Sequence, residues 1–160
     1  MRWSEKRRAY RGTGRPLKIV GYGPEEARLR SLLPTEATLV GKVDDLALRD
    51  LYRGCRAVIM AGVEDFGIVP VEAMACGRPA IVFGEGGGLE SVLPGQTGLV
   101  FEEPTAQSLR AAVDCLEGMR FNTAALRARA ETYRREVFEA RFRDFVERAL
   151  AADAERGTIP

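Results

Sequence analysis

Short apolar runs alternate with stretches of helical periodicity along almost the whole of this 160-residue chain. The apolar runs lie at 17–20, 38–40, 57–60, 80–83 and 98–101. The helices expected after them lie at about 25–33, up to about 54 with Asp44 or Asp45 as its cap, 67–76 and 106–118. Residues 84–90 lead into a further short helix that ends near Pro94, and two more helices follow at about 123–134 and 136–151. Strands joined by helical crossovers pair in parallel, because each crossover returns the chain to the same end of the sheet. The pattern predicts an α/β fold: a doubly wound, Rossmann-like parallel sheet flanked by helices.

The length suits a single domain, which we place at residues 17–151, between a basic amino-terminal arm or truncated helix at 1–16 and a flexible tail at 152–160. Residues 1–18 carry seven basic side chains against one acid, Glu5. Such an arm is either simply solvated or faces phosphates or an anionic membrane surface. The last expected helix has an apolar stripe that should pack against the sheet as core. The stripe consists of Val137, Phe138, Phe142, Phe145, Val146 and Leu150.

Composition excludes several classes of chemistry. The formal net charge is only +1, so nucleic acid is not expected as a partner. Histidine is absent, which excludes a Ser-His-Asp or Cys-His relay and histidine metal ligands within this chain. Cys55, Cys76 and Cys115 are odd in number and form no CxxC pair, so we expect buried thiols, no disulfide frame and no metal site. We expect no cofactor, and the sequence has neither an apolar leader nor a membrane span, which indicates a cytoplasmic protein with membrane contact through the arm at most.

Two glutamates flank a glycine after the third apolar run. Glu64 lies in the expected loop, Glu72 lies in the following helix, and Gly67 stands between them, where backbone can approach a ligand closely. A carboxylate in an otherwise apolar helix costs stability unless it is hydrogen-bonded. Glu72 could simply face the helix dipole, but the two hydroxyls of a ribose would give its placement a reason. The pair suits a ligand with a hydroxyl-rich end and an anionic end, such as a nucleotide-sugar.

Glycine-containing loops follow four of the apolar runs, at Gly21–Pro24, Gly41–Asp45, Met60–Gly67 and Gly84–Glu90. Ligands of open parallel sheets bind outside the carboxyl ends of the strands, and free N–H groups at helix starts attract anions. Tight turns also need glycine, so one such loop decides little, but four on one edge favour a phosphate-containing ligand. The dinucleotide fingerprint is incomplete, because Glu26 stands where it needs Gly or Ala.

The motifs occur in a fixed order along the chain. They are Gly21-x-Gly23-Pro24-Glu25, Val40-Gly41-x-Val43, Leu51-Tyr52-x-x-Cys55, Glu64-x7-Glu72, Glu72-Ala-Met-Ala-x-Gly77-x-Pro79, Gly86-Gly-x-x-Glu90 and Gly95-x-Thr97-Gly98-Leu99. From about Ala9 onwards this series resembles the carboxyl-terminal, donor-binding domain of the group 1 (family 4) retaining glycosyltransferases, which have the GT-B fold. The resemblance implies transfer of a hexose, with mannose as one candidate, from a GDP- or UDP-sugar to a glycan or lipid-linked acceptor without a metal.

The resemblance also implies roles for individual positions. Glu64 would contact hydroxyls of the transferred sugar, and Glu72 would hold the ribose. The backbone of residues 66–69 would meet the sugar and diphosphate, and the turn at 41–45 would line the base pocket. Two glycines of the first loop would shape the same cleft. The expected donor-binding residues are therefore Gly21, Gly23, Val43, Asp44, Phe66, Gly67, Ile68, Val69 and Glu72, with Glu64 as the catalytic residue.

The chain departs from the family pattern at its start. Full-length relatives carry an amino-terminal acceptor domain and then a first strand whose loop bears a cationic clamp for the diphosphate. This chain begins near Glu5–Arg11, within what should be the next helix. We therefore expect a missing acceptor domain, or a partner chain that supplies it, as in a split gene product or half of a heteromer. Two alternatives stay open: a non-catalytic nucleotide-sugar-binding module, and a degenerate domain that contacts a protein partner.

Overall fold

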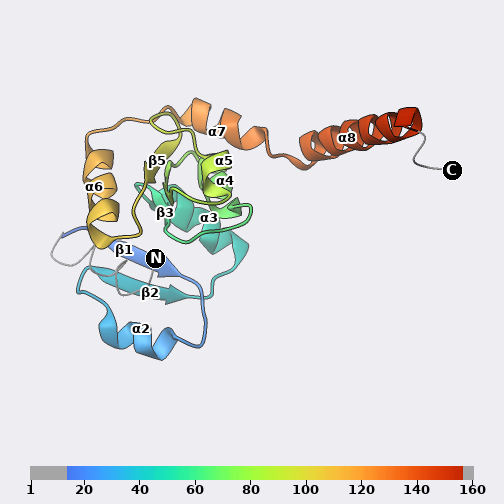
Figure 1. Cartoon of the computed structure of the whole chain (residues 1–160). Coiled ribbons are helices and arrows are strands. Elements are labelled where there is room, and N and C mark those ends of the chain that lie inside the picture. Colours follow the sequence, from blue (N-terminus) through green and yellow to red (C-terminus); the bar gives the residue numbers. More distant parts are fainter. Residues whose placement is uncertain (1–13, 157–160) are drawn as a thin grey trace.

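The computed structural model describes residues 14–156 and contains the predicted alternation of strands and helices (Figure 1). The strands are β1 (Leu17–Val20), β2 (Ala37–Gly41), β3 (Val58–Met60), β4 (Ala80–Phe83) and β5 (Gly98–Phe101). The helices are α2 (Glu26–Leu32), α3 (Asp45–Gly54), α4 (Ile68–Ala75), α5 (Gly88–Ser91), α6 (Ala106–Glu117), α7 (Thr123–Glu131) and α8 (Arg135–Arg156).

All strand pairs in the described part of the chain are parallel, which confirms the predicted fold class. The strands form two sheets, however, with the orders β1-β2 and β3-β4-β5. In the larger sheet Ile81 lies opposite Ile59 on one side and Leu99 on the other. In the smaller sheet the register of β1 against β2 shifts between Ile19 and Val20. The expected single sheet is thus divided, although helices flank both parts (Figure 1).

The core lies around β4, whose four residues are all buried. Ile81 and Phe83 pack with Phe101 of β5 and with Leu109 and its neighbours on α6. The rings of Phe83 and Phe101 lie 5.3 Å apart between centroids. A strand covered on both faces reads as a continuous apolar run, which is why Ala80–Phe83 could be found from sequence.

A second apolar contact joins α4 to α7. Met74 of α4 is completely buried against Leu126 and Ala130 of α7. The side-chain amide oxygen of Asn122 accepts hydrogen bonds from the backbone N–H groups of Ala124 and Ala125 and so caps the start of α7. This contact holds α4, which carries Glu72, against α7.

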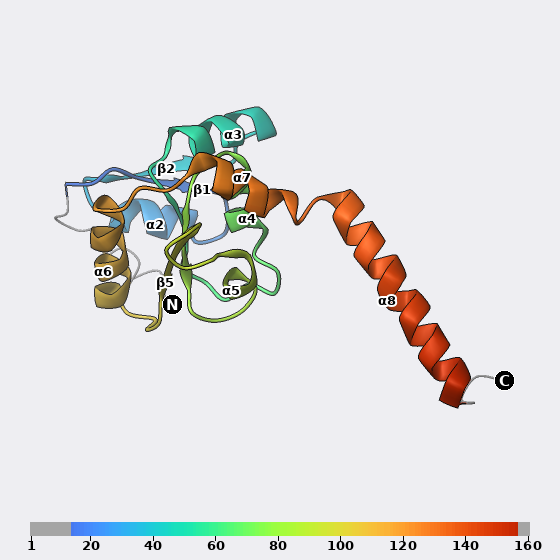
Figure 2. The ribbon, with the colours of Figure 1, turned by 90° about the horizontal axis from the view of Figure 1, so that it is seen from above.

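The last helix contradicts the expected core packing. α8 leaves the body of the domain and projects into solvent in both views (Figures 1 and 2). Phe138, Phe142 and Phe145 are 63%, 56% and 62% exposed. Leu150 is also exposed, and Val137 and Val146 are half-buried. The prediction was wrong because helical periodicity identifies an apolar face but not the element that covers it.

The two ends of the chain differ from the expectations in other ways. Residues 1–13 of the basic arm lie outside the described residues, whereas Arg15 donates to Asp114 at 2.5 Å and to Glu117 at 2.6 Å on α6. α8 continues to Arg156, past the point at which the flexible tail was expected to begin. No helix within residues 14–156 combines the length and apolar character needed to cross a membrane.

The cysteines are less buried than expected. Cys55 and Cys76 are half-buried, and Cys115 is exposed on α6. The expectation of buried thiols is therefore wrong for Cys115, because its helix turns only the face with Leu109, Ala112, Val113 and Leu116 toward the core.

Candidate functional site

The loop after β3 turns sharply at Gly67, directly before α4 begins. Gly67 has φ 70° and ψ 57°, a left-handed conformation that strongly favours glycine. A Cβ atom at this position would also lie 3.1 Å from the backbone nitrogen of Gly88 and 3.2 Å from the methyl carbon of Met60. Both the backbone conformation and the close packing therefore require glycine here.

The loop at 84–88 packs directly on this corner. The Gly87 N–H donates to the Glu64 carbonyl at 2.7 Å. A Cβ atom at Gly86 would lie 2.6 Å from that same carbonyl oxygen, and one at Gly87 would overlap the backbone of Phe66. The glycines of this motif thus have a packing reason: they let two loops at the ends of β3 and β4 touch through their backbones.

The Glu64 side chain is exposed on this corner. No hydrogen bond or ion pair holds its carboxylate within the part of the chain that the structure describes. Phe66 and Ile68 are also exposed, whereas Val69 is half-buried. The corner therefore presents to solvent the Glu64 carboxylate and the side chains of Phe66 and Ile68.

Glu72 lies in a different setting, half-buried on α4. The Tyr52 hydroxyl, from α3, donates to the Glu72 carboxylate oxygen Oε2 at 2.8 Å. Burial raises the pKa of Tyr52 well above its usual range, and the hydrogen bond to Glu72 raises it further. Tyr52 therefore satisfies one oxygen of the Glu72 carboxylate without a ligand, which offsets part of the cost of placing a carboxylate in an apolar helix.

An anchor that sequence reasoning missed fixes the end of α5. The Arg129 guanidinium donates to the carbonyls of Glu90 and Ser91, the latter at 3.0 Å, and to the Tyr133 hydroxyl at 2.8 Å. The Tyr133 hydroxyl in turn donates to the Glu90 carbonyl at 2.7 Å. The Tyr133 ring meets the Phe66 ring edge-to-face at 5.9 Å. We call the turn at Gly67 and the loop at 84–88 together the glycine corner. The anchor (Arg129 and Tyr133) thereby joins α7 to both loops of this corner.

The sequence contains only a weak signal for this anchor. Arg129 and Tyr133 are four residues apart, at the end of the helix predicted for 123–134, and a basic side chain near a helix end commonly binds carbonyls of its own helix. Here it binds those of α5 instead. Arg129 and Ser91 are 38 residues apart in the sequence, so no local sequence pattern could predict this contact.

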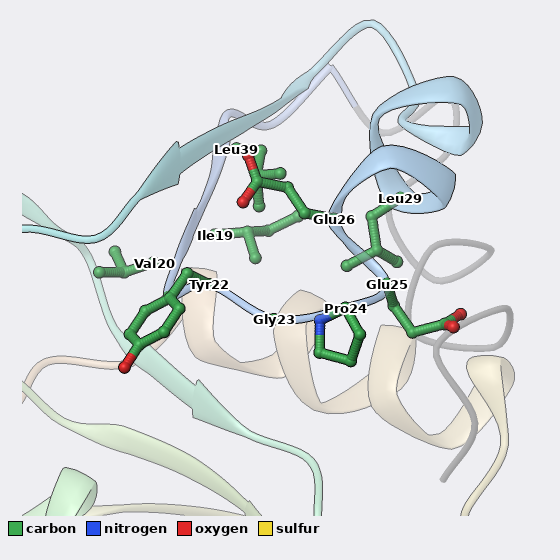
Figure 3. A pocket seen from close by; sticks show the side chains of 10 residues that line it. Ile19, Val20, Tyr22, Gly23, Pro24, Glu25, Glu26, Leu29 and Leu39 are labelled. Carbon is green, nitrogen blue, oxygen red and sulfur yellow. The ribbon is translucent and has the colours of Figure 1, made fainter.

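The predicted residues near β1 line a shallow hollow (Figure 3). It measures about 230 Å³, and Gly21 and Gly23 form part of its wall. Figure 3 shows Tyr22 on one side of it and Leu29 of α2 on the other. The remaining lining residues are Ile19, Val20, Pro24, Glu25, Glu26 and Leu39. Neither Glu64 nor Glu72 is among them, so the hollow lies between the β1–β2 edge and α2, apart from the two predicted carboxylates.

The turn after β2 lies beside that edge. The Gly21 N–H donates to the Gly41 carbonyl at 2.9 Å, and the Lys42 ammonium lies 5.4 Å from the centroid of the Tyr22 ring. Val43 is half-buried. Asp44 is the amino-terminal cap of α3, since its carboxylate accepts from the Ala47 N–H at 2.8 Å. Of the two aspartates considered as caps, Asp44 therefore has this structural task.

The predicted site residues thus fall into two groups. Gly21, Gly23, Val43 and Asp44 lie at the carboxyl ends of β1 and β2, and Glu64, Phe66, Gly67, Ile68, Val69 and Glu72 lie between β3 and α4. Helix α3 connects the groups: it begins at the Asp44 cap, and Tyr52 near its other end binds Glu72. Parallel strands with glycine corners at their carboxyl ends define a Rossmann-like domain with a ligand-binding edge.

Comparison with known proteins places this domain in a family. The sequence profile of the family described as "Glycosyl transferases group 1" matches residues 7–137. The chain belongs to the group 1 glycosyltransferases. Solved structures similar to it are GT-B glycosyltransferases, as the motif order implied.

Individual relatives are considerably longer than this chain. It is 36% identical over 84 residues to a D-inositol 3-phosphate glycosyltransferase of Rhodococcus opacus, a match that covers 52% of this chain and 19% of the relative. The sucrose-phosphate synthase of Thermosynechococcus elongatus matches with a TM-score of 0.66 and 25% identity, over 85% of this chain and 39% of the synthase. Anabaena HepE in complex with UDP-glucose shares the fold, with a TM-score of 0.59, 24% identity and coverage of 76% and 35%.

Proposed function

We propose that this chain is the donor-binding domain of a retaining glycosyltransferase. Its ligand would be a nucleotide-diphosphate sugar, a GDP- or UDP-hexose with mannose as one candidate, and the acceptor a glycan or lipid-linked sugar. The observation that carries the proposal is the glycine corner, where the exposed Glu64 precedes the Gly67 turn and the half-buried Glu72 lies on the helix that begins at this turn. Family membership and the UDP-glucose bound by HepE support the same ligand class.

Each group of site residues has a task in this proposal. Glu72 accepts hydrogen bonds from the ribose hydroxyls, and Glu64 binds hydroxyls of the transferred sugar. The backbone of residues 66–69 faces the sugar and diphosphate. The turn at Val43 and Asp44, together with Gly21 and Gly23, receives the base end of the donor.

The proposed chemistry is stabilisation of a leaving group. As the bond between the sugar and the diphosphate breaks, negative charge develops on the phosphate oxygens, and prepositioned N–H groups stabilise it. The acceptor hydroxyl attacks from the leaving-group face, and its proton passes to a phosphate oxygen. That route needs no histidine base, and this chain has none. Glu64 orients the sugar during the transfer.

Transfer also needs an acceptor-binding part. Since the chain spans 39% of the sucrose-phosphate synthase it matches, we propose that another domain or partner chain supplies that part. The same observation supports the second candidate, a module that binds a nucleotide-sugar without transferring it. The basic residues proposed to contact an anionic membrane lie mostly within 1–13, outside the described part of the chain.

A ligand panel tests donor binding directly. Thermal unfolding of the chain is followed with UDP, GDP, ADP and their hexose conjugates. A ligand at a hundred times its Kd should add about 2.7 kcal/mol to the free energy of unfolding. Absence of stabilisation by every member of the panel would contradict the proposal.

Substitution of the two carboxylates tests their roles. Because a hydrogen bond to a charged group is worth about 1.5–3 kcal/mol, Glu72→Gln should weaken binding of the unconjugated nucleotide by about tenfold or more. Glu64→Gln should weaken only the sugar conjugate. Glu139→Gln on the projecting α8 is the matched control and should bind like the original chain. Near-normal binding by both site variants would refute the assignment, and transfer assays with an added acceptor domain then separate enzyme from binding module.

A further inference from the structure

We infer that Tyr52 is a positioning residue for the donor ribose, acting through Glu72. This inference rests on the proposed function. The Tyr52 hydroxyl donates to Glu72 Oε2 at 2.8 Å, from a side chain that is only 9% exposed. The two residues come from different helices, α3 and α4, and are 20 positions apart. One helix thus fixes the direction of the carboxylate that the other carries.

The chemistry of the contact leaves room for a ligand. An ionised carboxylate accepts about four hydrogen bonds through its two oxygens, and a phenol supplies one. Tyr52 therefore occupies part of Oε2, and no hydrogen bond within residues 14–156 engages Oε1, which would be left for ribose hydroxyls. A glutamate side chain free to rotate must lose that freedom when it binds, whereas one already held in place does not. A fixed Glu72 should therefore bind the ribose more tightly than a mobile one.

Tyr52 is suited to this task by its protonation state. A tyrosine hydroxyl is protonated at neutral pH even with its usual pKa, and burial, together with the hydrogen bond to Glu72, raises the pKa of Tyr52, so it remains a donor in alkaline solution too. The ring is held as well as the hydroxyl, since Tyr52 is the buried residue of α3. A donor on a buried ring has few alternative orientations to offer the carboxylate.

The position of Tyr52 on α3 links the ribose contact to the turn proposed for the base. The Asp44 cap fixes the start of this helix at the carboxyl end of β2, and Tyr52 lies two turns further along. The turn proposed for the base and the Glu72 carboxylate proposed for the ribose are therefore both held by α3. A nucleoside would meet both at a set spacing.

The test must separate this role from a purely structural one, in which Tyr52 only satisfies its own buried hydroxyl. Tyr52→Phe removes the hydroxyl and keeps the ring. Calorimetry then compares whichever of UDP, GDP or ADP binds the original chain most tightly with its 2′-deoxy and 3′-deoxy counterparts. The quantity of interest is the ratio of the deoxy Kd to the ribo Kd, because it isolates the hydroxyl contacts.

We expect the original chain to prefer the ribonucleotide by about tenfold, the size of one charge-assisted hydrogen bond. Tyr52→Phe should reduce that ratio about threefold to fivefold and leave the deoxynucleotide Kd almost unchanged. Glu72→Ala should abolish the preference, and adding Tyr52→Phe to it should have no further effect on the ratio. The control is Ser31→Ala on α2, which also loses a hydrogen-bonded hydroxyl, at 2.9 Å from the Arg28 carbonyl, and should keep the full ratio.

Three results would overturn the inference. If Tyr52→Phe weakens ribo and deoxy ligands equally, or leaves or raises the ratio, Tyr52 does not position Glu72, while the proposed donor site stands. If the original chain binds nucleotide without preferring ribose, Glu72 is not a ribose ligand and Tyr52 has nothing to position. If no nucleotide binds at all, the proposed function fails and the inference fails with it.

Discussion

The two sheets of this domain are packed very differently. In the larger one, β4 is buried along its whole length and lies between α6 on one side and α4 with α7 beyond it. In the smaller one, β1 alternates between half-buried and exposed residues, and α2 has no buried residue at all. The glycine corner and Glu72 belong to the well-packed region, whereas Gly21 and Gly23 edge the thinly packed one. The glycine corner and Glu72, whose proposed roles need fixed positions, thus lie in the region that is packed tightly enough to fix them.

The most direct test of this difference in packing is to truncate one leucine to alanine in each region. Leu109→Ala removes a side chain that is 1% exposed in the core of the larger sheet and should lower the free energy of unfolding by about 2–5 kcal/mol. Leu29→Ala, on half-exposed α2, should cost about 1 kcal/mol or less. Urea unfolding of both variants measures the difference, and equal losses would mean that the two regions are packed alike.

A smaller effect is expected from adding one methyl group at the loops. Gly87→Ala pushes a Cβ into the backbone of Phe66, and such overpacking should cost about 1–3 kcal/mol and open the glycine corner. Gly23→Ala is the control, because a Cβ there would meet nothing within 4 Å. The free energies of unfolding of the two variants report the difference. A Gly87→Ala variant as stable as Gly23→Ala would show that the two loops can move apart freely.

The anchor between α7 and α5 should matter locally more than globally. Arg129→Met removes the donors to the Glu90 and Ser91 carbonyls and should cost about 1–2 kcal/mol. Hydrogen exchange should rise mainly at residues 86–92, since the loop loses its tether. Arg127→Met, on the exposed side of the same helix, should leave both exchange and stability unchanged. Faster exchange across the whole larger sheet would instead indicate a role in the core.

The smallest effect concerns the ion pair that ties Arg15 to α6. The hydrogen bond from Arg15 lowers the pKa of Glu117 below its unfolded value. A depressed carboxylate pKa adds stability above the unfolded pKa, and that contribution is lost as the pH falls through the folded pKa. Glu117→Gln should therefore lower the Tm slightly at pH 7, and by less at a pH low enough to protonate the original carboxyl as well. A difference in Tm that is the same at both pH values would exclude this origin.

The sequence predicted elements wherever local signals decide them. Apolar runs bounded by turns placed β1, β4 and β5 at their observed residues, and the Asp44 cap marked the start of α3. The sequence could not predict which element packs against an apolar helix face, so the phenylalanines of α8 were assigned to a core that they do not reach. The Tyr52–Glu72 bond was missed for a related reason: both residues were noticed separately, but only the fold brings α3 to α4. The local elements were therefore predictable, whereas the hydrogen-bond partners of the candidate site residues were not.

The Asp44 cap and the Tyr52–Glu72 bond together make the length of α3 a fixed quantity. One residue inserted between them would rotate the Tyr52 ring by about 100° around the helix axis, away from the carboxylate. One inserted before Asp44 would only lengthen a turn. Variants of this domain with changed length should therefore tolerate additions ahead of the cap and lose the contact when the addition falls behind it.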